Sequence, residues 1–488
     1  MNGRRSIRAA HVLAYADGGH VLLTDAEVVV EGARIVAVGP AGAAAADEVI
    51  ELGAVLLTPG LVDLDALTDI DHTILDSWQS RELGLGLQWS RDYAEQRRRA
   101  VFDAGERAFI REYGFVQLLL HGVTTAMPIA SEVHSDWAET FEDAVAMAEA
   151  ARRLGLRVYL GPSYRSGVNV VDSDGTRSIY WNEPLGRSGF EDAERFLEWA
   201  AAQESDLVHG ALLPCRIETL SEELMRRTAA LAERTGVLVR LHALQGLLER
   251  ELVLAEYGAP PLAVLERTGL LGPKLLVPHG IYVDSNPLVD ADTDTDIATL
   301  AAAGVTVIHC PLTMARHGAA LDSFARYRAA GVRMALGTDS FPPDLVRGID
   351  IGVTVAKVLA HRTDAATYAD YFAAATLGGA EALGRRDLGR IAVGAIADLV
   401  AFRLDDPLDG VLDDPVRTLC MNSTARAADF SMIAGRIVLR DGVIAGIDLP
   451  AMTRRAQQLF DRMRAAYSER DYLRRPVGEL FPPSFPSG

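Results

Sequence analysis

The chain has 488 residues, of which 49% are hydrophobic and 24% are charged. This balance is typical of a folded globular protein and excludes a disordered chain, a collagen-like repeat and a disulfide-dense scaffold. The formal net charge of −19 gives no electrostatic support for nonspecific binding to nucleic acid or to an anionic membrane surface.

The N-terminal segment contains short apolar runs separated by glycines and polar residues, a pattern typical of short antiparallel strands. Polar residues such as His11 and Asp17 interrupt it before an apolar export signal could form. No window approaches the roughly 18 to 20 apolar residues that a membrane helix needs. We therefore expect a cytoplasmic protein without a membrane or nucleic-acid partner.

From about Leu56 onwards, strand-like apolar runs alternate with helical segments, as expected for strand–helix units around a parallel sheet. Amphipathic helices are predicted over Ser221–Thr235 and Leu321–Ala330. The strand candidates are Leu56–Leu64, Thr124–Ile129, Arg157–Leu160, Leu207–Leu213, Val237–His242, Leu275–His279, Val305–His309 and Arg333–Gly337. Their number predicts an α/β protein built on a (β/α)8 barrel.

Short strands return after about Arg385, so two strand-rich ends flank the barrel. We divide the chain into the first part of a β-domain (1–58), a catalytic barrel (59–385) and the second part of the β-domain (386–448). The remainder (449–488) is predicted as a helix over Met452–Tyr467 followed by an extended, proline-rich tail.

In a (β/α)8 barrel the chemistry lies at the C-terminal ends of the strands, so polar residues that directly follow an apolar run are the site candidates. The segment 63–71 follows the first barrel strand, while His242, His279 and Asp339 follow later strands. Each residue alone is weak evidence, because buried polar residues often serve only to hold loops. Their occurrence at matching strand ends favours a common pocket.

The chain also contains a series of ordered motifs that span most of its length. They are TPGLVD (58–63), HGVTTA (121–126), LVRLHALQ (238–245), LLVPHGIYVD (275–284), VIHCPLTMARHG (307–318), AGVRMALGTDS (330–340) and IAVGAIADLVAF (391–402). In these motifs the sequence resembles the amidohydrolase superfamily, specifically its cytosine/guanine deaminase and triazine hydrolase branch. The resemblance implies a catalytic barrel, a small β-sandwich formed by both chain ends, and a homodimer.

The resemblance also implies a divalent metal that activates water for hydrolysis. His242 matches the strand-five ligand, Asp339 the strand-eight aspartate and His279 the strand-six histidine beside the metal-bound water. The strand-one His-x-His motif is lost, because Asp65 and Leu67 occupy its positions. Asp65, His242 and Asp339 then form the expected ligand set for zinc, iron or manganese, which is bound weakly or not at all.

A second departure lies three residues after His242, where the branch has a proton-transferring glutamate and this chain has Gln245. Gln245 and Asp65 are therefore predicted to contact substrate. His309 matches a common HCP signature of the branch and is also a substrate-binding candidate. Trp181 lies in a long insertion, Ser163–Gly189, that could close over a substrate. The acidic segment 69–76 is either a solvated loop with a helix cap or a set of relocated ligands.

Three functions follow from these residues. The first is an amidohydrolase-like hydrolase that cleaves a non-peptide C–N bond of a small cyclic or amidine-like compound. The second is a metal-free enzyme in which Asp339 and His279 act as an acid–base pair in hydrolysis, elimination or isomerisation. The third is a noncatalytic protein that binds a small molecule in the same pocket.

Overall fold

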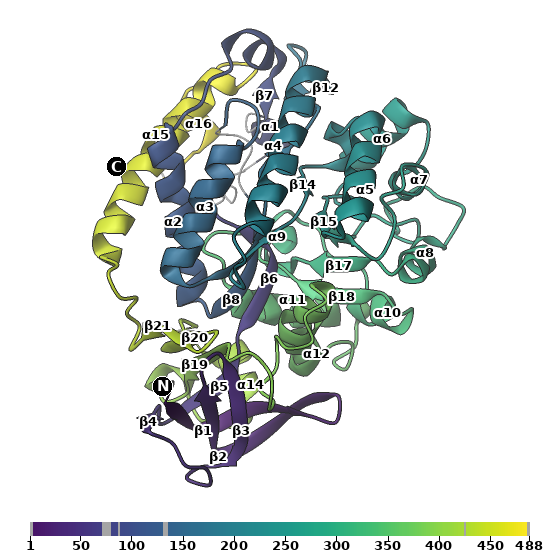
Figure 1. The fold of residues 1–488 in the computed structure, drawn as a ribbon. Helices are drawn as coiled ribbons and strands as arrows, with labels where there is room; N and C mark the ends of the chain where they lie inside the picture. Colours follow the sequence, from purple (N-terminus) through teal and green to yellow (C-terminus); the bar gives the residue numbers. More distant parts are fainter. Residues whose placement is uncertain (1–2, 71–79, 86–87, 130–134, 424–425, 486–488) are drawn as a thin grey trace.

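The computed structural model describes residues 3–70, 80–85, 88–129, 135–423 and 426–485. Two parts are visible in Figure 1: a barrel of strands surrounded by helices, and a smaller β-sheet below it. Within the described residues, none of the helices combines the length and the apolar character needed to cross a bilayer.

Eight parallel strands form the barrel predicted from the sequence. They are β6 (Leu61–Leu67), β8 (Val123–Ile129), β9 (Arg157–Leu160), β13 (Val208–Gly210), β15 (Val239–Arg240), β16 (Leu275–Pro278), β17 (Thr306–His309) and β18 (Arg333–Leu336). The strands pair in the orders β13-β9-β8-β6 and β15-β16-β17-β18. A bridge between Leu212 and Val239 joins the two halves on one side. On the other side the amide of Asp339 donates to the carbonyl of Asp65 at 2.8 Å, which closes the barrel.

The first strand candidate, Leu56–Leu64, is two strands in two different sheets. β5 (Val55–Pro59) belongs to the small sheet and β6 to the barrel, and Gly60 separates them. The amide of Gly60 donates to the carbonyl of Asp398 at 2.9 Å. A Cβ at this position would lie 2.0 Å from Oγ1 of Thr124, so only glycine fits where the chain passes between the sheets. One continuous apolar run in the sequence therefore concealed this junction.

Helices cover the outside of the barrel (Figure 1). They are α2 (Ala104–Leu120), α3 (Phe141–Leu154), α4 (Glu183–Ala201), α5 (Glu222–Thr235), α6 (Leu247–Tyr257), α7 (Pro261–Arg267), α8 (Asp296–Ala303), α9 (Pro311–Arg316), α10 (Phe324–Ala329), α11 (Leu345–Ala360), α12 (Tyr368–Ala373) and α13 (Gly379–Ala382). α5 confirms the predicted helix, since Ser221 caps its start and Gly236, in the left-handed region, ends it. α10 begins at Phe324, after its cap Ser323, and is shorter than the predicted segment from Leu321.

Both chain ends build the small β-domain, as predicted. Its sheet has the order β21-β20-β19-β5-β1-β2-β3, and β4 also pairs with β1. The bounds are β1 (Arg4–Ala16), β2 (Gly19–Glu31), β3 (Arg34–Pro40), β4 (Glu48–Glu51), β19 (Leu399–Arg403), β20 (Phe430–Ile433) and β21 (Arg436–Arg440). A separate apolar core, which includes Ile7, Val28, Leu57 and Leu399, stabilises this sheet.

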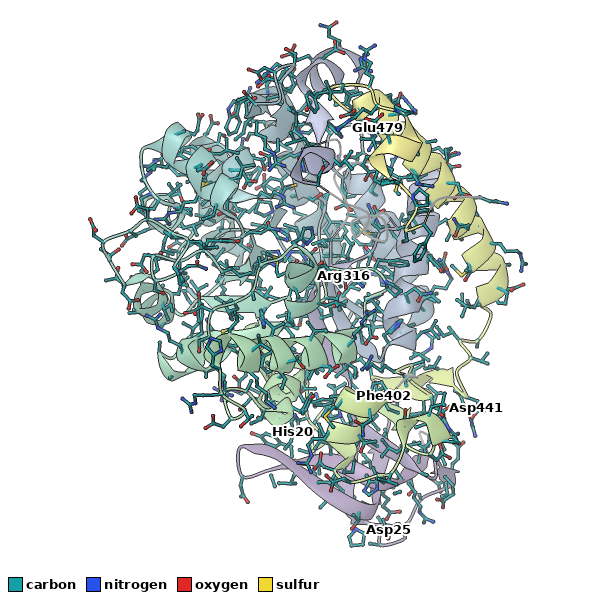
Figure 2. The ribbon with its side chains drawn as sticks, turned by 180° about the vertical axis from the view of Figure 1, so that it is seen from behind. His20, Asp25, Arg316, Phe402, Asp441 and Glu479 are labelled. Atoms are coloured by element: carbon teal, nitrogen blue, oxygen red, sulfur yellow. The ribbon has the colours of Figure 1, made fainter. Side chains whose placement is uncertain are left out.

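The small sheet also packs directly against the barrel. Phe402 on β19 lies at the junction of the two parts (Figure 2) and belongs, with Val400, to the main barrel core. Gly122, before β8, approaches so closely that a Cβ there would lie 2.7 Å from the Phe402 ring. The two parts therefore share a packed interface.

The C-terminal region forms the long helix α15 (Leu449–Arg470), which contains the predicted segment. It packs against α2 through Leu459, Met463 and Tyr467, which share a core with Ile110 and Tyr113. The predicted extended tail contains a short helix, α16 (Val477–Leu480), so that prediction was wrong for these residues. Phe481 packs on the Tyr467 ring, which explains why the tail folds back.

The insertion after β9 forms a hairpin near the C-terminal end of the barrel. β11 (Gly167–Val171) pairs with β12 (Arg177–Trp181) and with β7 (Trp89–Ser90). Two short strands, β10 (Ser163–Tyr164) and β14 (Leu213–Pro214), pair beside it. The other α-helices of the described residues are α1 (Arg81–Leu85) and α14 (Pro415–Arg417).

Candidate functional site

Asp65 lies near the end of β6, deep in the barrel, and is fully buried. Asp63 holds this strand end in place. Its Oδ1 accepts the amides of Asp65 and Thr338 at 3.1 and 3.0 Å, and its Oδ2 accepts the Thr338 hydroxyl at 2.6 Å. β6 and β18 are thereby fixed relative to each other, so Asp65 and Asp339 come from a rigid support.

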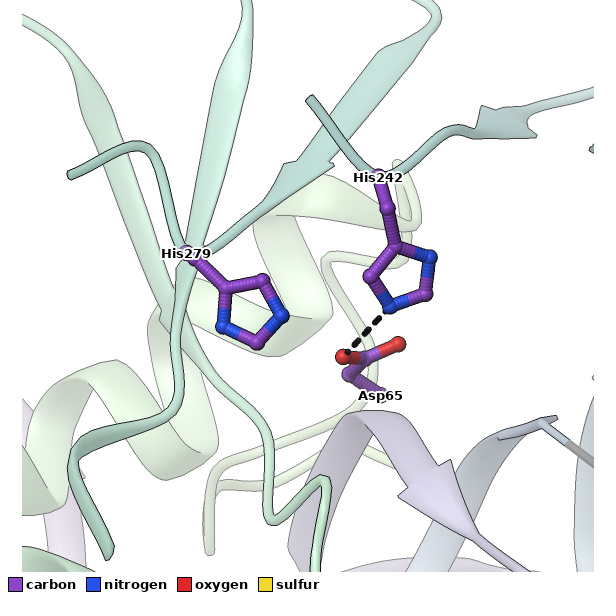
Figure 3. A group of neighbouring side chains, drawn as sticks. All are labelled: Asp65, His242 and His279. Atoms are coloured by element: carbon purple, nitrogen blue, oxygen red, sulfur yellow. Dashed lines mark ion pairs between the residues drawn. The ribbon is translucent and has the colours of Figure 1, made fainter. Parts of the chain in front are cut away.

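His242 follows β15 and faces Asp65 (Figure 3). Its Nδ1 lies 3.0 Å from the carbonyl oxygen of Cys215 and therefore carries a proton, because a carbonyl can only accept. Its Nε2 lies 3.4 Å from Oδ2 of Asp65. A neutral imidazole would place two acceptors face to face, so this contact requires a cation between or on these atoms, either a proton or a metal ion.

His279 follows β16, and its Nε2 lies 3.6 Å from Oδ2 of Asp339. Neither of its ring nitrogens has a hydrogen-bond partner among the described residues, although the side chain is completely buried. Both His279 and Asp339 have positive φ, at 69° and 39°. Non-glycine residues in this region carry strain that is concentrated at functional sites. The geometry thus favours a group that His279 binds, rather than a packed core histidine.

Three of these side chains can hold a divalent ion. One ligand atom each from Asp65, His242 and His279 lies within 4.8 Å of the others, and all three residues are buried. Two donors on one tetrahedral zinc ion lie about 3.4 Å apart, because each is about 2.0 to 2.1 Å from the metal. The 3.4 Å between His242 and Asp65 matches this value. The donor set, one carboxylate and imidazole nitrogens, therefore fits zinc, iron or manganese.

The structure differs from the expected ligand set in one respect. Asp339 is expected to be a ligand beside Asp65 and His242, and His279 to be a neighbour. The mutual 4.8 Å group instead contains His279, while Asp339 contacts this group through His279. Asp339 thus lies beside this group, in contact with His279.

Sequence reasoning missed Arg240, which is buried on β15 two residues before His242. Its Nε lies 3.4 Å from Oδ1 of Asp65, and its Nη1 and Nη2 donate to the carbonyls of Met127 and Pro128 at 2.8 and 3.2 Å. The sequence feature that could have revealed Arg240 is a charged residue within the apolar run of a predicted strand. The two-residue period of a strand places it on the same face as His242.

Charge and burial shift the acidities of the site strongly. Burial raises the pKa of Asp65, but the charges of His242 and Arg240 and a hydrogen bond to His242 outweigh burial and hold that pKa below its ordinary range. Burial and the negative charge of Asp65 raise the pKa of Asp339 well above its usual value. Burial, followed by the charge of His242, lowers the pKa of His279. Charge and burial thus favour an ionised Asp65, a protonated Asp339 and a neutral His279.

Gln245 lies on the loop after β15, where Arg216 donates from Nη1 to its Oε1. The loop is held from behind by the buried Glu249, whose carboxyl oxygens accept the amides of Leu244 and Gln245 at 2.6 and 2.9 Å. Leu244 has a φ of 59°, which these two bonds stabilise. Arg216 and Glu249 were not found from the sequence.

The remaining predicted residues lie outside the metal-binding group. Leu67 packs in an apolar cluster with Ile70, Phe102 and Phe341. His309 does not face the pocket as expected, because it packs against the rings of Phe324 and Tyr371, at 6.0 and 5.9 Å. Strand alternation explains this difference, since the next residue, Cys310, points inwards and its Sγ lies 3.7 Å from Oδ2 of Asp65.

Trp181 ends β12 opposite Gly167, on the hairpin of the insertion.

In the acidic segment, Asp69 is buried and forms an ion pair with Arg111 of α2 at 3.1 Å, which indicates a structural role. Asp71, His72 and Asp76 lie outside the described residues. Asp284 caps the following loop, because its carboxylate accepts the amides of Thr295 and Asp296 at 2.7 and 3.1 Å.

A cavity of about 740 Å³ lies at the other end of the barrel, near the starts of the strands. Tyr159, His209 and Lys274 are among its lining residues, and none of the four acidic and histidine residues of the site is. The candidate site and this cavity are therefore separate features.

The chain matches a known protein family and is similar to several characterised proteins. The sequence profile described as "Amidohydrolase family" matches residues 56–470. The chain is 28% identical over 472 residues to the 5-methylthioadenosine/S-adenosylhomocysteine deaminase of Halobacterium salinarum, covering 93% of this chain and 98% of the relative. It is 28% identical over 344 residues to the 8-oxoguanine deaminase of Pseudomonas aeruginosa, covering 70% and 73%.

Solved structures show the same fold. An adenosine deaminase from Xanthomonas campestris, with bound zinc, superimposes with a TM-score of 0.78 at 25% identity, covering 94% of this chain and 98% of that one. The triazine hydrolase of Arthrobacter aurescens gives a TM-score of 0.74 at 20% identity, covering 94% and 99%. These findings confirm the predicted fold class, and the chain belongs to the amidohydrolase family.

Proposed function

We propose that this chain is a hydrolase that cleaves a non-peptide C–N bond of a small cyclic or amidine-like compound, with one divalent metal ion in the site of Asp65, His242 and His279. The approach of His242 Nε2 to Asp65 Oδ2 at 3.4 Å carries the proposal, because two acceptors at this distance need a cation. The family match and the deaminase relatives support it.

A divalent ion in this site would lower the pKa of a bound water and polarise the bond under attack. Asp65 offers an ionised carboxylate, and His242 offers the Nε2 lone pair because its Nδ1–H is committed to the Cys215 carbonyl. His279 offers a buried nitrogen without a hydrogen-bond partner among the described residues. These three side chains would hold the ion.

Asp339 is the proposed proton carrier. In the metal-free site, burial and the charge of Asp65 raise the pKa of Asp339 and favour its protonated form. Asp339 can give this proton to the leaving nitrogen and regain one from the attacking water. His279 Nε2 lies 3.6 Å from Oδ2 of Asp339, so the proposed metal ligand and the proposed proton carrier are neighbours. Gln245 replaces the branch's glutamate, so its amide can bind substrate but cannot transfer a proton near neutral pH. Proton transfer therefore depends on Asp339.

The metal site is atypical if Asp65 and Leu67 replace the two histidines of the strand-one motif. Leu67 packs in the apolar cluster and offers no donor, while Asp65 offers a charged oxygen in place of a neutral nitrogen. We infer that the resulting site, with fewer nitrogen donors, binds its metal more weakly than one with His-x-His.

Ammonia release from a panel of amino-heterocycles, including purine bases and nucleosides, tests the proposed activity. We expect turnover of at least one compound, together with its loss in Asp339→Ala. Two relatives are a 5-methylthioadenosine/S-adenosylhomocysteine deaminase and an 8-oxoguanine deaminase, so amino-purines are the first compounds to try. No release from any of them, with zinc, iron or manganese added, would contradict the proposal.

Metal-free acid–base catalysis is the second candidate, and the proximity of Arg240 to Asp65 favours it. The guanidinium already supplies a positive charge 3.4 Å from Oδ1, and the protonated Asp339 with the neutral His279 forms an acid–base pair. Activity that a chelator abolishes and zinc restores would exclude this candidate. Activity that persists after complete removal of metal would support it.

The cytoplasmic location and the homodimer stay predictions, and light scattering of the purified protein tests the second. A small molecule remains the proposed partner, with no nucleic acid or membrane.

A further inference from the structure

The carboxylate of Asp65 lies between the side chains of His242 and Arg240. Its Oδ2 faces His242 Nε2 and accepts a contact from Cys310 Sγ, while its Oδ1 faces Arg240 Nε. Both Asp65 Oδ1 and Arg240 Nε lack a hydrogen-bond partner within the part of the chain that the structure describes. At 3.4 Å these two atoms attract each other as charges without forming a hydrogen bond.

The guanidinium of Arg240 is held firmly in this position. Its Nη1 and Nη2 donate to consecutive carbonyls, Met127 and Pro128, at the end of β8. The side chain is 4% exposed, and that of Asp65 is fully buried. A buried charge without a partner is strongly destabilising, so the Asp65 carboxylate requires a nearby cation even when no metal is bound.

We propose that Arg240 is the built-in counter-charge of Asp65, which stabilises the metal-free protein and weakens the binding of a divalent ion. The proposal rests on the proposed function only in that Asp65, His242 and His279 are the metal-binding residues. Arg240 neutralises Asp65 before any ion arrives, and it repels the ion that does arrive. The metal of this site is therefore exchangeable.

This role separates Arg240 from a merely structural arginine. Arg157, at the start of β9, is also fully buried and forms an ion pair with Asp398, but at the opposite end of the barrel. Replacing either arginine with methionine breaks a buried ion pair and lowers the stability of the metal-free protein. Only the replacement of Arg240 changes the charge beside the metal site.

Zinc titration in competition with a chromophoric chelator tests the proposal without any substrate. We expect Arg240→Met to bind zinc at least about tenfold more tightly than the wild type, because a repelling charge is removed. Arg240→Lys keeps the charge and is expected to stay within about threefold of the wild type. The matched control Arg157→Met is expected to stay within about twofold, because it lies far from the site. Equal or weaker binding by Arg240→Met would overturn the proposal.

A thermal-unfolding cycle keeps the test valid if Arg240→Met folds poorly. We expect Arg240→Met without metal to unfold at a lower temperature than the wild type, and Asp65→Asn/Arg240→Met to recover most of the loss, because no charge then lacks its partner. A double variant that is no more stable than Arg240→Met would show that the two charges do not compensate each other.

The two proposals fail in different ways. A wild-type protein that binds zinc, shows the Arg240→Met effect and releases no ammonia contradicts the proposed function alone. A wild-type protein that releases ammonia with zinc, but whose zinc affinity does not change in Arg240→Met, overturns this inference alone. A wild type that binds neither zinc nor iron nor manganese overturns both proposals.

Discussion

Both ends of the barrel bury charged side chains, but the two ends differ in how many of the buried polar atoms have hydrogen-bond partners. At the starts of the strands, Arg157 donates to Asp398, Thr125 and the backbone and side chain of Asp206, and Asp398 also accepts the amide of Ala434. At the strand ends, the described contacts leave Asp65 Oδ1 and both His279 nitrogens without a hydrogen bond. Buried polar groups with hydrogen-bond partners stabilise a fold, whereas buried polar groups without such partners indicate a site for a ligand.

The largest expected effect follows from removing the proton carrier at the strand ends. Asp339→Asn is expected to lower kcat/KM by about a thousandfold, because an amide cannot transfer the proton. Steady-state ammonia release measures this loss. The control is Asp284→Ala, which removes a loop cap and is expected to lower stability by roughly 1 kcal/mol while kcat/KM is kept. Full turnover by Asp339→Asn would remove Asp339 from the mechanism.

Breaking the satisfied pair at the strand starts is expected to affect stability and not chemistry. Arg157→Met leaves Asp398 buried without its partner and is expected to lower the free energy of unfolding by about 3 to 5 kcal/mol. Arg157→Met/Asp398→Leu is expected to recover most of this loss. Urea unfolding measures the free energy of unfolding of both variants. If the single variant lost less than about 1 kcal/mol, the ion pair at the strand starts would not be the stabilising contact that we infer.

A pH-dependent effect is expected behind the site loop. Burial and the charge of Glu218 raise the pKa of Glu249 from 4.5 to about 8. Between these values the folded protein keeps a proton that the unfolded chain releases, so the free energy of unfolding falls as the pH rises. Glu218→Gln is expected to flatten this dependence, which urea unfolding across this pH range measures.

The control for this prediction is Glu223→Gln on α5, because Glu223 is exposed. A wild-type stability that rises through the same pH range would contradict the assignment to Glu249, as would an unchanged slope in Glu218→Gln.

The smallest effect is expected from Glu27 in the small sheet, whose carboxylate is fully satisfied. Burial raises its pKa, but the Ser6 hydroxyl, the amides of Ala44 and Gly42, and Arg8 outweigh burial and lower it from 4.5 to about 2. This stabilisation is present above pH 4.5 and is lost as the pH falls towards 2. Glu27→Gln removes the titrating group, so the variant is expected to lose less stability than the wild type as the pH falls from 4.5 towards 2. Acid unfolding followed by circular dichroism measures this difference. The exposed Glu31→Gln should not, and equal curves for Glu27→Gln and the wild type would contradict this prediction.

Most of the barrel could be predicted from the sequence because buried parallel strands are continuous apolar runs. β9 has the predicted bounds, Arg157–Leu160. The junction at Gly60 was missed, since two buried strands in succession look like one run until the close approach of Thr124 is known. The short helix in the tail was missed because it depends on the contact of Phe481 with Tyr467, which is not local in the sequence.

The site could be predicted in part for the same reason. His242, His279 and Asp339 directly follow apolar runs, so their strand ends were visible. Arg240 was not recognised because its role depends on carbonyls of the neighbouring strand β8. The inward position of Cys310 rather than His309 depends on strand alternation, which the signature of the branch did not reveal.

The most direct test of the metal site is elemental analysis of the purified protein, dialysed against zinc without chelators. We predict about one bound equivalent in the wild type, its loss in His242→Ala, and its retention in His209→Ala at the other end of the barrel. Less than about a tenth of an equivalent in the wild type at saturating zinc would contradict the account and leave Arg240 as the cation of the site.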